Sequence, residues 1–174
     1  VFLVGEAFFD IAKDESQPFY VKTTDVEIKV LGTQFNVSAY PEDYSVQTAL
    51  AEGRVELSRV NAGFLEKKIQ LSPGEMAYFN KKSRETIIYK VDLEYYTLWT
   101  DGLFSFSNTD LNRIIRKLER FYNIHFQFDD PLKGSIQISG KLDVTKEKDE
   151  VFEYLSNLTG LDFIKLNENN YAIK

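Results

Sequence analysis

The segment Phe104–Phe128, FSFSNTDLNRIIRKLERFYNIHFQF, contains a strand pattern, a helix pattern and a second strand pattern in immediate succession. Phe104 and Phe106 alternate with serines, which is typical of a half-buried strand. Ser107, followed three residues later by Asp110, predicts the start of a helix through a variant capping box. Apolar residues then recur at steps of three and four along one side of that helix; they are Leu111, Ile114, Ile115, Leu118, Phe121 and Tyr122. Alternation resumes from residue 124 to 128, so the segment predicts one strand-helix-strand unit.

The same order of elements follows downstream. Ile136 and Ile138 begin another strand, and Gly160 is placed to end a second helix. The apolar side of this helix carries Val151, Phe152, Leu155 and Leu158. Residues 161–166 and 171–173 then predict a hairpin. We therefore expect residues 103–174 to form a small α+β domain with two strand-helix-strand units and one extra strand, whose helices pack together over a single small sheet.

The first half of the chain has a period of two and no helix-period segment. The alternating apolar sets are Val26/Ile28/Val30, Phe35/Val37/Ala39, Val55/Leu57 and Ile87/Tyr89/Val91. Turn residues break these runs at Gly5, Gly32, Pro41, Gly53, Gly63 and Pro73-Gly74. The pattern predicts a β-rich N-terminal domain over residues 1–95, built as a sandwich, a barrel or a solenoid-like stack, and a linker at 96–102.

The composition of the chain indicates which classes of molecule it can bind. The formal net charge of −6 and the sequence pI near 4.9 would repel a phosphate backbone, so we expect no nucleic-acid binding. The absence of cysteine excludes disulfides and fits a periplasm as well as a cytosol. No stretch approaches the roughly 20 apolar residues that span a bilayer. Because Val1–Val4 already has the pattern of a strand interior, we expect the sequence to be part of a longer protein that contacts the membrane only through a helix further towards the N-terminus.

Residues capable of chemistry are scattered. His125 is the only histidine and has no cysteine, serine or acid at catalytic spacing, so we expect a structural or surface role. Asp10, Glu52, Glu56 and Glu75 could supply the carboxylate pair that glycosidases use, but acids this frequent are expected on a solvated face. The sequence has no histidine pair at i, i+4, no EF-hand spacing and no glycine-rich phosphate loop. We expect no catalytic activity, no cofactor and no metal.

Several strings, taken in order and with their spacing, resemble the FecR family of periplasmic regulators. In the first half they are GEAFFDIAKD (Gly5–Asp14), PFYVKT (Pro18–Thr23), LGTQFNV (Leu31–Val37), Leu50–Val55 and LSPGE (Leu71–Glu75). In the second half, Trp99–Phe106 followed by Leu111, Leu118, Glu119, Arg120 and Tyr122 is similar to the C-terminal module of the family. The resemblance covers nearly the whole chain.

The resemblance implies a FecR domain followed by a domain like the secretin and TonB short N-terminal fold, held in the periplasm by an inner-membrane anchor. It also implies a relay, in which the signalling domain of a TonB-dependent outer-membrane transporter contacts this region. A cytoplasmic segment of the same regulator, absent from this sequence, would then control an extracytoplasmic-function sigma factor. Some members cleave themselves inside the Leu-Gly-Thr string, which here is the pair Gly32 and Thr33; a glycine turn before the strand Gln34–Val37 is the structural interpretation that we favour.

A partner could add a strand to an open sheet edge, and four residues are candidates for that edge: Ile136, Ile138, Tyr171 and Ile173. The same alternation is typical of core side chains, which is the interpretation we favour for them. A second function class is an envelope glycan- or ligand-binding module, which would expose several Tyr or Trp side chains on one face. A third is a glycan hydrolase, which requires two convergent carboxylates in a concave site.

Overall fold

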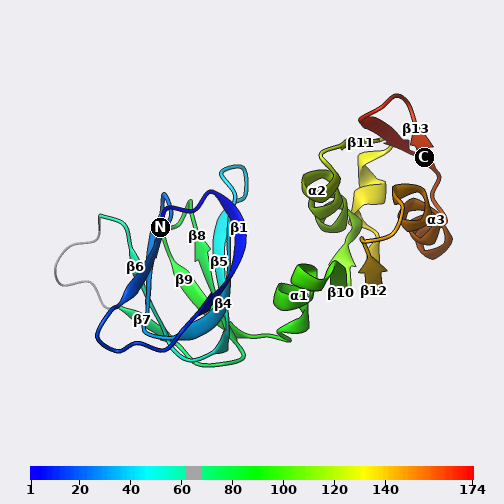
Figure 1. The fold of residues 1–174 in the computed structure, drawn as a ribbon. Helices are drawn as coiled ribbons and strands as arrows, with labels where there is room; N and C mark the ends of the chain where they lie inside the picture. The colour runs from blue at the N-terminus through cyan, green and yellow to red at the C-terminus, as the bar shows by residue number, and fades with distance from the viewer. Residues whose placement is uncertain (62–67) are drawn as a thin grey trace. The chain divides into compact units, whose positions relative to one another are not determined.

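The computed structural model describes residues 1–61 and 68–174, which fall into two compact units, Val1–Thr97 and Leu98–Lys174 (Figure 1). The turn expected at Gly63 lies outside the described residues. None of the helices in the described part of the chain is long and apolar enough to cross a membrane.

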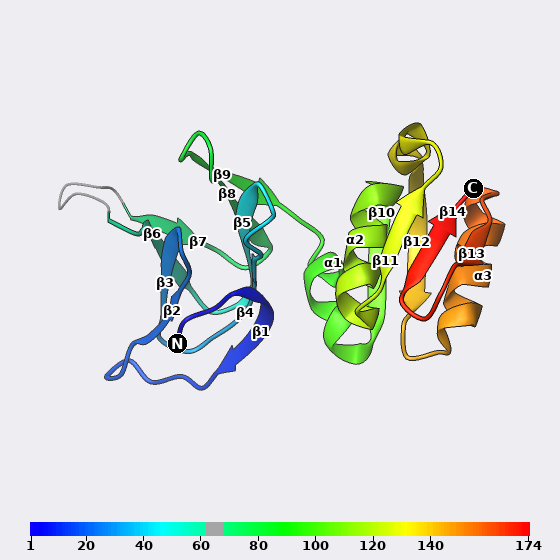
Figure 2. The same cartoon turned by 90° about the horizontal axis from the view of Figure 1, so that it is seen from above.

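The first unit contains two antiparallel sheets (Figures 1 and 2). The five-stranded sheet has the order β1-β4-β5-β8-β9, with β1 at Gly5–Ile11, β4 at Thr33–Ala39, β5 at Ser45–Glu52, β8 at Glu75–Asn80 and β9 at Thr86–Lys90. The four-stranded sheet has the order β2-β3-β6-β7, with β2 at Phe19–Lys22, β3 at Val26–Val30, β6 at Val55–Arg59 and β7 at Ile69–Leu71. A short helix, α1 (Glu94–Thr97), ends the unit.

Both sheets of this unit contribute to one apolar core. On β3, Val26, Ile28 and Val30 are buried at every second position, and on β4, Phe35 and Val37 do the same. Alternation puts one face of each strand in the core because successive side chains point to opposite faces. The prediction of a β-rich first half is therefore confirmed, in the form of a sandwich of two sheets.

The second unit alternates strands and helices. Its elements are η1 (Leu98–Asp101), β10 (Leu103–Asp110), α2 (Leu111–Tyr122), β11 (His125–Phe128), η2 (Pro131–Ser135), β12 (Gln137–Asp143), α3 (Lys148–Thr159), β13 (Phe163–Lys165) and β14 (Asn170–Ile173). The sequence predicted both strand-helix-strand units and the closing hairpin, in which β13 pairs antiparallel with β14.

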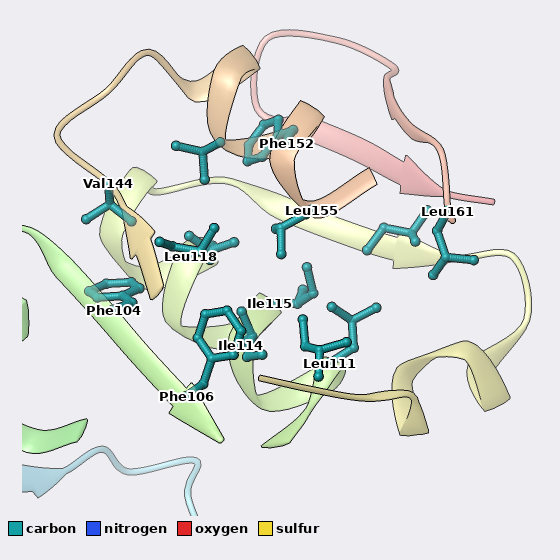
Figure 3. Packing of buried hydrophobic residues seen from close by; sticks show 14 of the residues in the cluster. Phe104, Phe106, Leu111, Ile114, Ile115, Leu118, Val144, Phe152, Leu155 and Leu161 are labelled. Carbon is teal, nitrogen blue, oxygen red and sulfur yellow. The ribbon is translucent and has the colours of Figure 1, made fainter. Parts of the chain in front are cut away.

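The expectation of one small sheet was wrong, because the strands of the second unit form two. The strands that precede the helices pair as β10-β12, and those that follow them join β14 in the order β11-β14-β13. Figure 3 shows side chains from α2, α3 and the strands meeting in one core. Residues of both sheets belong to that core, among them Phe104 and Leu142 of one sheet and Tyr171 and Ile173 of the other.

The ends of the helices test two further predictions. Gly160 lies after α3 with φ 72° and its N–H donates to Ser156 O at 2.8 Å, so the predicted glycine cap is confirmed. The predicted start of α2 at Ser107 was wrong, because β10 continues through a bulge to Asp110. Asp110 is the N-cap residue and its side chain makes no capping hydrogen bond.

Candidate functional site

The Gly32-Thr33 pair lies where the chain passes from β3 into β4. Gly32 has φ 132°, a conformation that L side chains rarely adopt, and Thr33 is only 3% exposed. The Thr33 hydroxyl donates to Arg54 O at 3.0 Å and accepts the Arg54 N–H at 3.4 Å. Both of these partners are backbone groups, so the hydrogen bonds of Thr33 join the start of β4 to the turn before β6.

Gly53 makes this close approach possible. A Cβ atom at Gly53 would lie 2.5 Å from Gly32 O and 2.9 Å from Thr33 Oγ1. A Cβ at Gly32 would meet the backbone of Lys13 closer still. The two glycines therefore allow three chain segments to touch, and Gly32 lies directly before β4, where the sequence predicted a glycine turn.

The four candidate edge residues belong to the core of the second unit or pack against it. Ile138, Tyr171 and Ile173 are 7%, 3% and 0% exposed, and Ile136, which is partly buried, packs against the same core cluster. Tyr171 and Ile173 lie on β14, the central strand of its sheet, which pairs with β11 on one side and β13 on the other. An added strand therefore has no free edge at Tyr171 and Ile173.

The strand that carries Ile138 differs, because β12 is paired only with β10 within the described residues. Val144 N–H donates to Gly102 O at one end of this ladder and Leu111 N–H to Ile136 O at the other. Since neighbouring residues of an antiparallel strand direct their backbone groups to opposite sides, those of Gln137, Ser139 and Asp143 point away from β10. Sequence periodicity could not show this, because it reports the faces of a strand and not its neighbours.

The edge of β11 is less accessible. The carboxylate of Glu119, on α2, accepts the outward N–H of Phe126 at 2.8 Å. His125, on the same strand, donates its N–H to Asn169 O at 2.8 Å and has an exposed side chain. A side-chain cap on an edge N–H is one of the ways in which proteins prevent strand addition.

Three of the four carboxylates that could have formed a hydrolase site, those of Asp10, Glu56 and Glu75, take part in separate surface interactions. Asp10 accepts from the Gln34 amide at 3.2 Å, and Glu75 accepts the Ser72 N–H at 2.8 Å. Glu56 accepts from the Lys68 ammonium at 2.7 Å, and this hydrogen bond raises the pKa of Lys68. These acids have partners in three different places, and the described residues contain no group of three metal-binding side chains.

Other shifted pKa values belong to turns and to the core. A hydroxyl two residues further along donates to Asp14 and to Asp143 and lowers the pKa of each carboxyl group. A hydrogen bond from Lys133 lowers the pKa of Asp129. Burial raises the pKa of Tyr122, whose hydroxyl donates to Val144 O at 3.1 Å. Each shift is explained by a local structural contact.

The exposed tyrosine side chains are spread over different elements of the fold. Among the described residues the exposed tyrosines are Tyr20, Tyr44, Tyr89 and Tyr154, and no strand, turn or helix supplies more than one of them. Trp99, the only tryptophan, packs against the core of the second unit. A sugar-binding face requires neighbouring rings in one plane, so the structure offers no observation in favour of that function.

The chain thus consists of a β-sandwich unit and a small α+β unit, and each has outer strands that are paired on one side only within the described residues. The family model "FecR protein" matches residues 2–56, and the model "FecR, C-terminal" matches residues 103–173. No match is found among the curated proteins.

Two crystal structures, at 1.65 and 2.50 Å resolution, are similar to the chain over 99% of its length and 78% of theirs, with 30% identity and TM-scores of 0.82 and 0.80. Both are of a protein described as a "putative anti-sigma factor" from Parabacteroides distasonis ATCC 8503. The chain belongs to the FecR family of anti-sigma factors, a regulatory and non-enzymatic family.

Proposed function

We propose that this chain is the periplasmic signal-receiving region of a transmembrane anti-sigma factor. In this proposal it contacts the signalling domain of a TonB-dependent outer-membrane transporter and, through a cytoplasmic segment of the same protein, regulates an extracytoplasmic-function sigma factor. The observation that carries the proposal is membership of the FecR family over both units, with the two family models in the order expected of such a regulator.

The second unit supports the proposal because it has an accessible edge at which a partner strand could pair. The outer edge of β12 carries the outward backbone groups of Gln137, Ser139 and Asp143, and the side chains of Gln137 and Ser139 are exposed. Strand addition gives affinity through main-chain hydrogen bonds and specificity through alternate side chains. Of the four residues predicted for a partner edge, only Ile138 lies on this strand, but its backbone groups face β10 and its side chain lies in the core.

The first test is a calorimetric titration of the chain with the N-terminal signalling domain of the transporter encoded nearest to its gene. We expect saturable binding, and we expect it to be lost when the signalling domain of an unrelated transporter is used. No binding at high micromolar concentration would exclude the transporter as the partner.

A pair of proline variants locates the contact. Gln137→Pro removes an outward N–H from the β12 edge and leaves the ladder with β10 intact. Ser105→Pro is the matched control, because the N–H of Ser105 points outward on the opposite edge, that of β10. We expect the first variant to weaken binding at least about tenfold, corresponding to roughly 1.4 kcal/mol, and the second to bind normally. The reverse result would move the contact to β10.

A further inference from the structure

Strand β9 is an unusually apolar edge. It is the outer strand of the five-stranded sheet and, within the described residues, pairs only with β8. Its three central residues, Ile87, Ile88 and Tyr89, are 51%, 43% and 45% exposed. Edge strands are normally protected by charges, proline, bulges or covering segments, and Lys90 is the only charged residue that β9 has.

Other edges in the same unit are protected. Along β2, Leu3 N–H donates to Lys22 O at 2.8 Å and Lys22 N–H to Val1 O at 2.9 Å, so residues 1–3 cover that edge. Strand β7 has only three residues, and β1 carries the acidic side chains of Glu6 and Asp10. The edge of β9 is therefore the apolar one among the four outer strands of this unit.

The hydrogen bonds at its ends show which backbone groups of β9 point outward. Asn80 N–H donates to Glu85 O at one end and Val91 N–H to Gly74 O at the other, both at 2.9 Å. The register between these points is regular, from Phe79 opposite Thr86 to Glu75 opposite Lys90. Since hydrogen-bonded positions alternate along an antiparallel ladder, Thr86, Ile88 and Lys90 direct their N–H and C=O groups away from β8.

We propose that β9 pairs antiparallel with β9 of a second copy of this chain, about a two-fold axis at Ile88. In this register Ile88 lies opposite Ile88 of the other copy, and Ile87 lies opposite Tyr89 of the other copy. The outward backbone groups of each β9 strand then face the outward backbone groups of the other strand, so they can form hydrogen bonds. Aromatic and β-branched residues are favourable cross-strand neighbours. The apolar face continues onto β8, where Tyr78 meets Tyr89 edge to face with ring centroids 6.4 Å apart.

The charges on and beside β9 favour this register, and they favour a second copy of the chain as the partner strand. A shift of two residues in one direction would set Lys90 opposite Arg84 of the other copy, and like charges directly opposite are destabilising. A shift in the other direction would set Lys90 against Ile88. With the axis at Ile88, Lys90 lies opposite Thr86 and no like charges face each other, so β9 is complementary to itself.

The interface is small. Pairing of five residues on each strand supplies about six backbone hydrogen bonds and a few apolar contacts, at the low end of specific protein interfaces. The dimer is therefore weak and forms at high protein concentration. The proposal is independent of the transporter contact, because β9 lies in the first unit and the test uses the chain alone.

Sedimentation equilibrium from low micromolar to near-millimolar concentration measures the association. We expect the mean mass to rise towards that of a dimer, and Ile88→Lys to keep the chain monomeric because it places two ammonium groups against each other across the axis. Leu132→Lys is the matched control, since Leu132 is 77% exposed and lies in the second unit. A monomer over the whole range, or a dimer that Ile88→Lys leaves unchanged, overturns the proposal.

Cross-linking tests the register. The chain has no cysteine, so Ile88→Cys introduces a single thiol. Hydrogen-bonded antiparallel neighbours have Cα atoms about 5.5 Å apart, which is within the range of a disulfide. We expect oxidation to give a covalent dimer of Ile88→Cys and much less of Tyr89→Cys, whose two thiols would be out of register. Equal cross-linking of both variants, or none, contradicts the two-fold axis at Ile88.

Discussion

Thr48 is a buried residue of the first unit whose hydroxyl group is unsatisfied within the described part of the chain. It is 0% exposed on β5, and its hydroxyl has no hydrogen-bond partner among the described residues. Leaving a buried hydroxyl unsatisfied costs about 1–3 kcal/mol. We expect Thr48→Val, which keeps the shape and removes the hydroxyl, to raise the free energy of unfolding by about 1 kcal/mol in a denaturant titration.

Thr33→Val is the matched control for this prediction. Thr33 is also buried in the same unit, but its hydroxyl makes two hydrogen bonds to the backbone of Arg54. We expect that substitution to lower stability by about 1–2 kcal/mol, because it removes both bonds. Equal losses in the two variants would mean that the Thr48 hydroxyl has a partner.

Gly53 is a second residue whose replacement should change the free energy of unfolding. It has φ 90°, and an added Cβ would lie 2.5 Å from Gly32 O. Gly74 has a similar φ of 82°, but a Cβ there would have no atom within 4 Å. We expect Gly74→Ala to cost about 1–2 kcal/mol from the backbone conformation alone, and Gly53→Ala to cost more because the chain must also move apart. Equal unfolding free energies for the two variants would show that the contact at Gly53 relaxes freely.

The Gly32-Thr33 peptide gives a third prediction at this scale. Self-cleavage requires the Thr33 hydroxyl to attack the Gly32 carbonyl carbon, so that the C–N bond breaks, an ester forms and the hydroxyl proton passes to the new amine. Water must then hydrolyse this ester, which leaves a carboxylate on Gly32 and restores the hydroxyl of Thr33. In the structure the hydroxyl is held instead by the backbone of Arg54. We expect intact-mass analysis of the freshly purified chain to show one uncut species that is stable for days; two fragments that meet at Gly32 would show that the hydroxyl leaves these bonds.

Among the elements, helix α2 combines a fully apolar side with an unusual charge pattern. Arg113, Arg116, Lys117 and Arg120 are its basic residues, Glu119 is its only acid, and its first turn contains no acidic residue. A cation near a helix N-terminus opposes the macrodipole, and like charges three or four residues apart repel. The helix therefore depends on the burial of Leu111, Ile114, Ile115 and Leu118 more than on its surface.

We expect Arg113→Glu to raise the free energy of unfolding of the second unit by about 0.5–1 kcal/mol, since a carboxylate in the first turn suits the macrodipole and faces Lys117 one turn later. Arg113→Gln, which removes the charge without adding an acid, should give a smaller gain. Denaturant titrations at low and high salt check the cause, because an electrostatic gain must shrink as salt is added. A gain independent of salt would contradict it.

The elements also show what sequence alone could predict. The period of two identified the strands around Val26–Val30 and Phe35–Val37, and the three-four spacing identified α2, because these patterns record which side chains are buried. Neither pattern states which strand lies beside which. For that reason the split into two sheets in the second unit, and the central position of β14, were not predicted. The same limit applies to the sites, since Tyr171 on a central strand and Ile87 on an edge strand have similar sequence patterns.

At the scale of the whole molecule, the two units have separate cores. The buried residues of one core fall between Val21 and Phe79, and those of the other between Phe104 and Ile173. The second unit is small for a single hydrophobic core, and small domains are marginally stable. Its aromatic cluster compensates: Phe152 contacts the rings of Tyr122, Phe126, Phe163 and Tyr171 at centroid distances of 6.1, 5.3, 6.1 and 5.0 Å.

Because the described core residues are not shared, we expect the chain to unfold in two transitions, and residues 98–174 expressed alone to show the same transition as in the whole chain. The variant Phe152→Ala shows which transition belongs to which unit. Truncation of a buried phenylalanine costs about 3–5 kcal/mol, which is enough to shift or abolish the transition of the second unit. Phe152→Ala should leave the transition of the first unit unchanged. Val37→Ala truncates a buried side chain of the first core, so it should shift the transition of the first unit and leave that of the second unchanged. Movement of both transitions in either variant would mean that the units fold as one cooperative body, and the second unit could then not be studied apart from the first.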